Sequence, residues 1–129
     1  HGQKLKQVDY TFDVLKKTLG NTFKNTLIIT LTEFGRTLVQ NNGYGTEHGY
    51  GTSILLGGGL VKKSQVYADW PGIKNKNLFE GRDLNSTLDA RSVYCSAMSV
   101  CFDTDFQLLN TEVFPDEKLN DLTEILFKA

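Results

Sequence analysis

The stretch Thr26-Leu27-Ile28-Ile29-Thr30-Leu31-Thr32 decides the fold of this chain. It is a short apolar, β-branched run without polar alternation, which is typical of a strand covered on both faces. We therefore expect a central strand of a parallel sheet. Glu33-Phe34-Gly35-Arg36 follow directly. Because ligands of open α/β sheets bind at the carboxyl ends of the strands, the carboxylate and the guanidinium are expected near a site.

The segment before this strand has the apolar spacing of an amphipathic helix. Apolar residues recur at intervals of three and four, and lysines lie elsewhere on the helix; the stripe is Leu5, Val8, Phe12, Leu15 and Leu19. Gly20 and Asn21 tolerate the left-handed conformation that closes a helix. The helix is therefore expected to end there. A helix leading into a strand is half of a βαβ unit.

The segment after the strand, residues 37–52, is polar, glycine-rich and too long for a simple turn. Seven of the twelve glycines fall between Gly43 and Gly59. This concentrates backbone freedom in the loop where His48 is presented. Neither nucleotide-binding glycine pattern fits these residues, and no G-x-S-x-G, H-E-x-x-H or paired C-x-x-C motif occurs in the chain.

Further elements are expected downstream. Residues 53–56 and 65–68 have the composition of short strands, and residues 89–102 have a helical pattern. Pro115-Asp116-Glu117 predicts the start of a final helix, with the apolar stripe Leu119, Leu122, Ile125 and Leu126. The 129 residues suffice for a single domain of α/β class.

Composition excludes several classes of protein. The formal net charge of -1 provides no broad field for nucleic acid or anionic lipid. The apolar runs are too short to span a bilayer, and no signal peptide opens the chain. Cys95 and Cys101 lie six residues apart on different helix faces, so we expect two buried free thiols and no zinc site at these cysteines.

Three side chains are candidates for chemistry. The imidazole of His48 is a common type of metal ligand, although a histidine in a mobile surface loop is the ordinary alternative. Glu33 is placed to reach a ligand at the sheet edge, or to form an ion pair with Arg36. Arg36 suits a bidentate anion clamp for phosphate or sulfate, or a structural pairing with a carboxylate.

The order of Leu31-Thr32-Glu33-Phe34-Gly35-Arg36-Thr37, Gly45-Thr46-Glu47-His48-Gly49 and Tyr67-Ala68-Asp69-Trp70-Pro71-Gly72 resembles the family called domain of unknown function 1501. Members show T-E-F-G-R-T, G-T-D-H-G and G-D-W-P-G in this order. They are often exported by the twin-arginine route and are placed by fold with alkaline phosphatases and sulfatases. Glu47 replaces the usual aspartate and Ala68 the usual glycine.

The resemblance implies the C-terminal fragment of a larger domain, with a partial alkaline-phosphatase-like sheet and flanking helices. It implies a divalent metal, zinc, calcium or manganese. The implied metal ligands are Glu33, His48, Glu47 and, from the family's D-T-H-x-x-Q segment, His1. Phe34 stands where the superfamily has a paired histidine, so a complete two-metal site is not implied. The nucleophile would lie upstream of residue 1.

The function implied is part of a periplasmic or exported metal-dependent hydrolase of phosphate or sulfate esters, in which Arg36 holds the anion. Its partners would be the remainder of the parent chain and a small anionic ester. The alternative is a non-catalytic, metal-depleted module for binding or assembly. The presence of Phe34 in place of a metal-binding histidine favours this alternative. A third interpretation is a free-standing small domain with residues 43–59 as a flexible lid.

Overall fold

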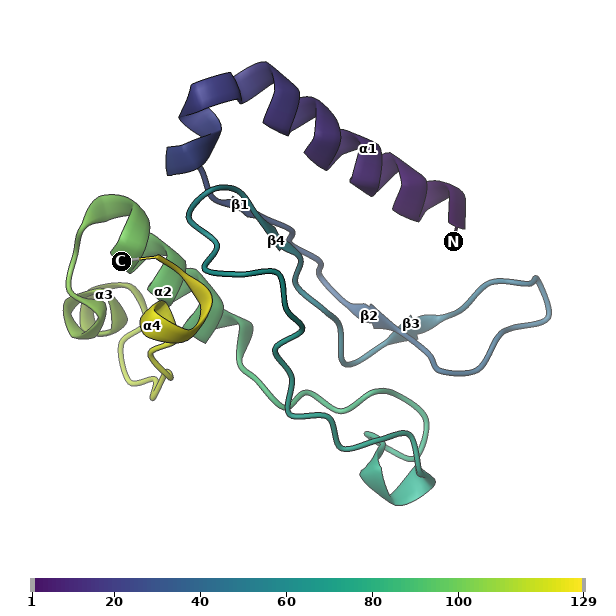
Figure 1. The fold of residues 1–129 in the computed structure, drawn as a ribbon. Coiled ribbons are helices and arrows are strands. Elements are labelled where there is room, and N and C mark those ends of the chain that lie inside the picture. Colours follow the sequence, from purple (N-terminus) through teal and green to yellow (C-terminus); the bar gives the residue numbers. More distant parts are fainter. Residues whose placement is uncertain (1, 129) are drawn as a thin grey trace.

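The computed structural model describes residues 2–128 (Figure 1). In chain order the elements are helix α1 (Gly2–Leu19), 3₁₀ helix η1 (Gly20–Asn25), strands β1 (Ile28–Ile29), β2 (Gly35–Arg36), β3 (His48–Gly49) and β4 (Leu56–Gly57), 3₁₀ helix η2 (Asn75–Asn77), and helices α2 (Ala90–Phe102), α3 (Phe106–Val113) and α4 (Thr123–Leu126). The first predicted helix is confirmed. Gly20, with a φ of 52°, follows its last residue.

The four strands form two antiparallel two-stranded sheets, which follow one another along a single two-stranded ribbon, rather than a parallel sheet. β1 pairs with β4 and β2 with β3, and between the two pairs the amide of Thr30 donates to the carbonyl of Leu55. The expected parallel sheet is therefore wrong. The chain returns through the turns of residues 38–47 as a hairpin, whereas parallel pairing would need a long crossover connection. The mixture of helices and short strands agrees with the α/β expectation at its coarsest level.

The register changes by one residue along the ribbon. Ile29 lies opposite Leu56, and Arg36 lies opposite His48. From Ile29 to Arg36 the chain advances by seven residues, whereas from His48 to Leu56 it advances by eight. The second strand of the ribbon therefore contains one extra residue. Such a bulge increases twist and changes which face each side chain reaches.

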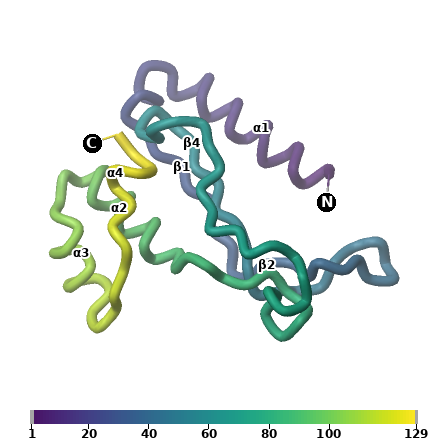
Figure 2. Tube along the Cα trace, turned by 60° about the horizontal axis from the view of Figure 1, so that its bottom comes forward, coloured from purple at the N-terminus to yellow at the C-terminus, as the bar shows by residue number. Residues whose placement is uncertain are grey.

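The two faces of the β1–β4 pair contact different helices. Ile29 and Leu56, opposite each other, pack against the helical core. On the other face, a Cβ added to Gly57 would lie 2.3 Å from the ring of Phe12 in α1. Figures 1 and 2 accordingly show α1 running along the ribbon, with α2, α3 and α4 gathered at one end of it. The expectation that strand 26–32 is covered on both faces therefore holds at Ile28–Ile29.

The core lies where α2 and α4 meet the ribbon. Its buried members are Val93, Ala97, Leu122, Leu126 and Phe127. Helix α2 begins where the side chain of Asp89 accepts a hydrogen bond from the amide of Arg91 at 2.9 Å. The helix predicted over residues 89–102 is thus confirmed, with Asp89 as its N-cap.

The final helix is much shorter than predicted, and α3 was not expected at all. Residues 117–122 are irregular, and helix α4 begins only at Thr123. The amides of Asn120 and Leu122 donate instead to the hydroxyls of Ser92 and Ser96 in α2, at 3.0 and 2.9 Å. Because these buried hydroxyls satisfy the backbone, the segment lies against α2 without forming its own helical hydrogen bonds.

Two smaller expectations are also wrong. Residues 65–68 form no strand, and the side chain of Val66 is 92% exposed, so nothing within residues 2–128 covers an apolar strand face there. Both cysteines are free, but only Cys95 is buried. Cys101 is exposed because the last turn of α2 extends past the core, as the exposure of Phe102 also shows.

The surface of the chain is large for its mass. A compact monomer of 14.4 kDa exposes about 6,800 Å², whereas this chain exposes 9461 Å². Helix α1 contains no buried residue, and Leu5 is 64% exposed. Much apolar surface is therefore available for contact with further protein. Among the described residues, no helix combines the length and apolar character needed to cross a bilayer.

The hydroxyl of Ser96 tests the packing of the last segment on α2. It is fully buried, donates to the Ser92 carbonyl and accepts from the Leu122 amide. Ser96→Ala leaves that buried amide unpaired, which is expected to lower the free energy of unfolding by about 1–3 kcal/mol. Urea denaturation measures this, with the exposed Ser64→Ala as the control. Equal stability of the two variants would rule out the proposed role of Ser96.

Candidate functional site

His48 lies in strand β3 rather than in a loop. It is exposed and directly opposite Arg36 of β2. Its ring stacks on Phe34, with ring centroids 3.8 Å apart and an interplanar angle of 29°. The guanidinium carbon of Arg36 lies 5.5 Å from the centroid of the Phe34 ring, within the range of a cation–π contact. The three side chains therefore form one cluster on one face of the ribbon.

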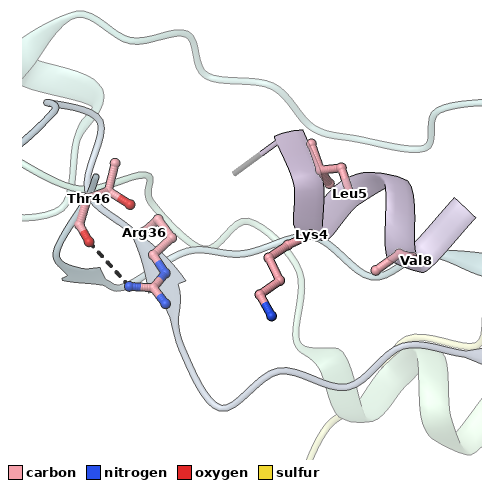
Figure 3. A pocket seen from close by; sticks show the side chains of 5 residues that line it. All are labelled: Lys4, Leu5, Val8, Arg36 and Thr46. Atoms are coloured by element: carbon pink, nitrogen blue, oxygen red, sulfur yellow. Dashed lines mark hydrogen bonds between the residues drawn. The ribbon is translucent and has the colours of Figure 1, made fainter. Parts of the chain in front are cut away.

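Arg36 also lines a shallow hollow between the ribbon and the first turns of α1. Lys4, Leu5 and Val8 of α1 form one wall, and Arg36 and Thr46 form the other, around a volume of about 370 Å³. Figure 3 shows Lys4 extending from α1 toward the side of the gap that holds Arg36. The Nη1 of Arg36 donates to the carbonyl of Thr46 at 3.2 Å, which fixes the guanidinium at this edge. Two cations thus border a hollow with apolar walls.

A second ring pair lies next to the end of β3. The paired residues of β2 and β3 are Gly35 with Gly49 and Arg36 with His48, and continuing this register by one residue would place Phe34 opposite Tyr50. The contact between the hydroxyls of Thr32 and Thr52, at 3.1 Å, extends this register. Tyr50 stacks on Phe79, with ring centroids 4.0 Å apart and an interplanar angle of 17°. Two stacked ring pairs therefore lie at this end of the ribbon.

Glycine is required at several positions around His48 because the backbone of another segment lies too close for a Cβ atom. A Cβ at Gly35 would lie 1.8 Å from the carbonyl oxygen of Gly51, and one at Gly49 would lie 2.5 Å from the backbone of Arg36. A Cβ at Gly51 would meet the Leu84 carbonyl at 2.6 Å. The sequence interpretation, in which glycines such as Gly49 and Gly51 give the backbone around His48 its freedom, is therefore replaced. They let two strands and a neighbouring segment approach one another.

Asn41 organises the connection between β2 and β3. Its Oδ1 accepts hydrogen bonds from the amides of Gly43 and Gly45, at 3.0 and 2.9 Å. Its Nδ2 donates to a carboxylate oxygen of Glu47 at 2.6 Å. This arrangement is a turn closed by the hydrogen bonds of one side chain. The carboxylate of Glu47, one of the implied metal ligands, accepts a hydrogen bond from Asn41 within this turn.

Within residues 2–128, the implied ligands Glu33, Glu47 and His48 are not part of a group of metal-binding side chains. Glu33 forms no ion pair or hydrogen bond with Arg36 or His48 within residues 2–128, and strand alternation assigns it to the opposite face. The described residues contain no group of three or more histidine, cysteine, aspartate or glutamate side chains able to hold a metal ion. His1 lies outside the described residues. These residues alone do not fit a complete metal centre.

Asp83 is a buried residue of the site that sequence reasoning missed. Only 2% of it is exposed, and its Oδ2 accepts from the amide of Tyr50 at 3.1 Å. The Nε and Nη2 of Arg82 donate to its two oxygens, at 2.9 and 2.8 Å. Asp83 therefore holds the strand that presents His48 and Tyr50. The only sequence signal was an Arg-Asp pair in an irregular polar segment.

Arg82 lowers the pKa of Asp83, mainly through its side-chain hydrogen bonds. An aspartate with a depressed native pKa contributes stability above its unfolded pKa of about 4 and loses that contribution as pH falls through the native value. We expect Asp83→Asn to flatten the acid side of the stability profile. The profile is measured by urea denaturation between pH 7 and pH 2. The exposed Asp69→Asn is the control and should keep the slope of the parent protein.

Comparison with known proteins adds the family of the chain. A family model described as "Protein of unknown function (DUF1501)" matches residues 1–101. This range contains the ribbon, the Arg36 cluster and nearly all of α2. No curated protein and no solved structure shows a significant match. Because the family match covers most of the chain and includes every residue of the candidate site, the chain belongs to the DUF1501 family of proteins of unknown function.

Proposed function

We propose that this chain forms the anion-binding wall of a site for phosphate or sulfate esters, with Arg36 and Lys4 as the groups that hold the anion. The observation that carries this proposal is the placement of both cations around one hollow, beside the exposed imidazole of His48. The chain has a formal net charge of -1, so the two cations are a local arrangement rather than part of a general positive surface.

The chemistry of the cluster suits an oxyanion. A guanidinium presents several N–H donors in a plane, matching the oxygens of phosphate or sulfate. The hydrogen bond from Arg36 to the Thr46 carbonyl and the nearby ring of Phe34 orient this plane before an anion binds. Fixed donors near developing negative charge stabilise the transition state of ester cleavage. Leu5 and Val8 would accommodate the apolar part of the ester.

His48 is the residue of this cluster that can bind a metal or transfer a proton. Within residues 2–128 its ring contacts Phe34, and neither ring nitrogen has a hydrogen-bond partner. A divalent zinc, calcium or manganese ion at His48 would need further ligands from outside residues 2–128, such as His1 or another part of the parent protein. The large exposed surface of the chain supports such a partner, which we propose is the remainder of the parent protein.

A non-catalytic binding module is the competing proposal. The stacking of His48 on Phe34 and the engagement of Glu47 by Asn41 favour it, because both groups are already in use within the chain. An anion-binding wall serves either function. Measurements of metal binding and ester turnover with the whole protein distinguish the hydrolase from the non-catalytic binding module.

Anion binding is expected to depend on Arg36. Isothermal titration calorimetry with inorganic phosphate and sulfate measures it. Arg36→Ala is expected to raise the dissociation constant at least about ten-fold, because a charge-assisted hydrogen bond contributes about 1.5–3 kcal/mol. The exposed Lys63→Ala removes the same charge away from the hollow and should bind like the parent protein. Equal weakening by both variants would indicate only nonspecific attraction and would contradict the proposal.

Metal binding is expected to depend on His48 if the protein is a hydrolase. Elemental analysis of the intact protein and of His48→Ala measures the bound metal, and we expect the variant to lose it. A screen of phosphate and sulfate esters with added zinc, manganese or calcium should then show turnover in the parent protein alone. Equal metal in both proteins would remove His48 from the ligand set. Absence of turnover under all metals would favour the binding module.

A further inference from the structure

Two stacked ring pairs, His48 on Phe34 and Tyr50 on Phe79, lie at the end of the ribbon that carries Arg36. We call these four rings the ring row. Phe34, Tyr50 and Phe79 are 36%, 52% and 36% exposed, respectively. Large aromatic side chains gain most of their stabilisation from burial, so a row that stays this exposed offers binding surface to a ligand.

We propose that the ring row binds a planar aromatic group of the ester, of the size and shape of a nucleobase, while the phosphate lies between Arg36 and Lys4. The inference rests on the proposed function, because it uses the same anion wall and adds the class of organic group. It predicts a mononucleotide-like substrate or ligand. Neither nucleotide-binding glycine motif is needed, because the rings and the two cations do the binding.

The geometry of the row selects flat rings. Both ring pairs are nearly parallel, with centroids 3.8 and 4.0 Å apart. A planar aromatic group extends such a stack with favourable offset contact between π faces. Stacking of one base on an aromatic side chain contributes enough to change affinity about ten-fold or more. A sugar or an alkyl group lacks the planar π face that this arrangement matches.

The charges favour a single nucleotide over a nucleic-acid strand. Binding along a strand uses a groove of positive charge that follows many phosphates. Here Arg36 and Lys4 border one hollow, and the formal net charge of the chain is -1. Two cations at one end of a ring row match one phosphate attached to one base.

Two probes separate the base from the phosphate. Adenosine 5′-monophosphate carries both, whereas ribose 5-phosphate carries the same sugar and phosphate without the base. Calorimetric titration of the intact protein is expected to show about ten-fold tighter binding of the nucleotide. Equal binding of the two probes overturns the role of the ring row but leaves the anion wall standing. Failure of both probes to bind contradicts the proposed function itself.

Substitutions in the ring row test which residues recognise the base. Tyr50→Leu and Phe79→Leu keep apolar volume but remove the π face, so nucleotide binding should fall about ten-fold, to the level of ribose 5-phosphate. Binding of ribose 5-phosphate should not change, and this also shows that the variants are folded. Tyr67→Leu is the matched control, because Tyr67 is 47% exposed and lies outside the row. An unchanged preference for the nucleotide in both ring variants overturns the inference.

Discussion

The close approach of backbone at Gly35, Gly49 and Gly51 determines how this chain presents its candidate site. No side chain fits at these positions, since an added Cβ would lie between 1.8 and 2.6 Å from the backbone of a neighbouring segment. On one face of the β2–β3 pair, the backbone of neighbouring segments therefore leaves no room for side chains. Asp83 completes this arrangement, because its buried carboxylate binds both the Tyr50 amide and Arg82. The side chains with chemistry consequently lie on the opposite face.

The helices α1 and α2 could be predicted because their signals are local. The apolar period of residues 5–19 and the capping aspartate before α2 each lie within the element that they determine. The direction of strand pairing could not be predicted in this way. An apolar run such as residues 26–32 is compatible with parallel or antiparallel neighbours, and the choice depends on how the following segment returns.

The errors nearer the C-terminus have a shared cause, which is contact between segments distant in sequence. Leu119, Leu122, Ile125 and Leu126 have helical spacing, yet hydroxyls of α2 take up the backbone hydrogen bonds of residues 120 and 122. Asp83 was missed for the same reason, because its partner Tyr50 lies 33 residues away. By contrast, Arg36 and His48 were chosen from residue type and local context. Only the structure shows that they are opposite neighbours, with Phe34 between them as a ring contact.

The distribution of charge around His48 favours an anion over a bare metal ion on this face. Lys4 and Arg36 border the hollow, whereas Glu47 is held by Asn41 and Glu33 is assigned to the other face. A divalent cation placed here would be repelled by both basic groups unless carboxylates from elsewhere offset their charge. An anion is attracted by the same two groups and needs no further residues. For this reason the described residues support the proposed anion site, while the proposed metal site would need ligands beyond them.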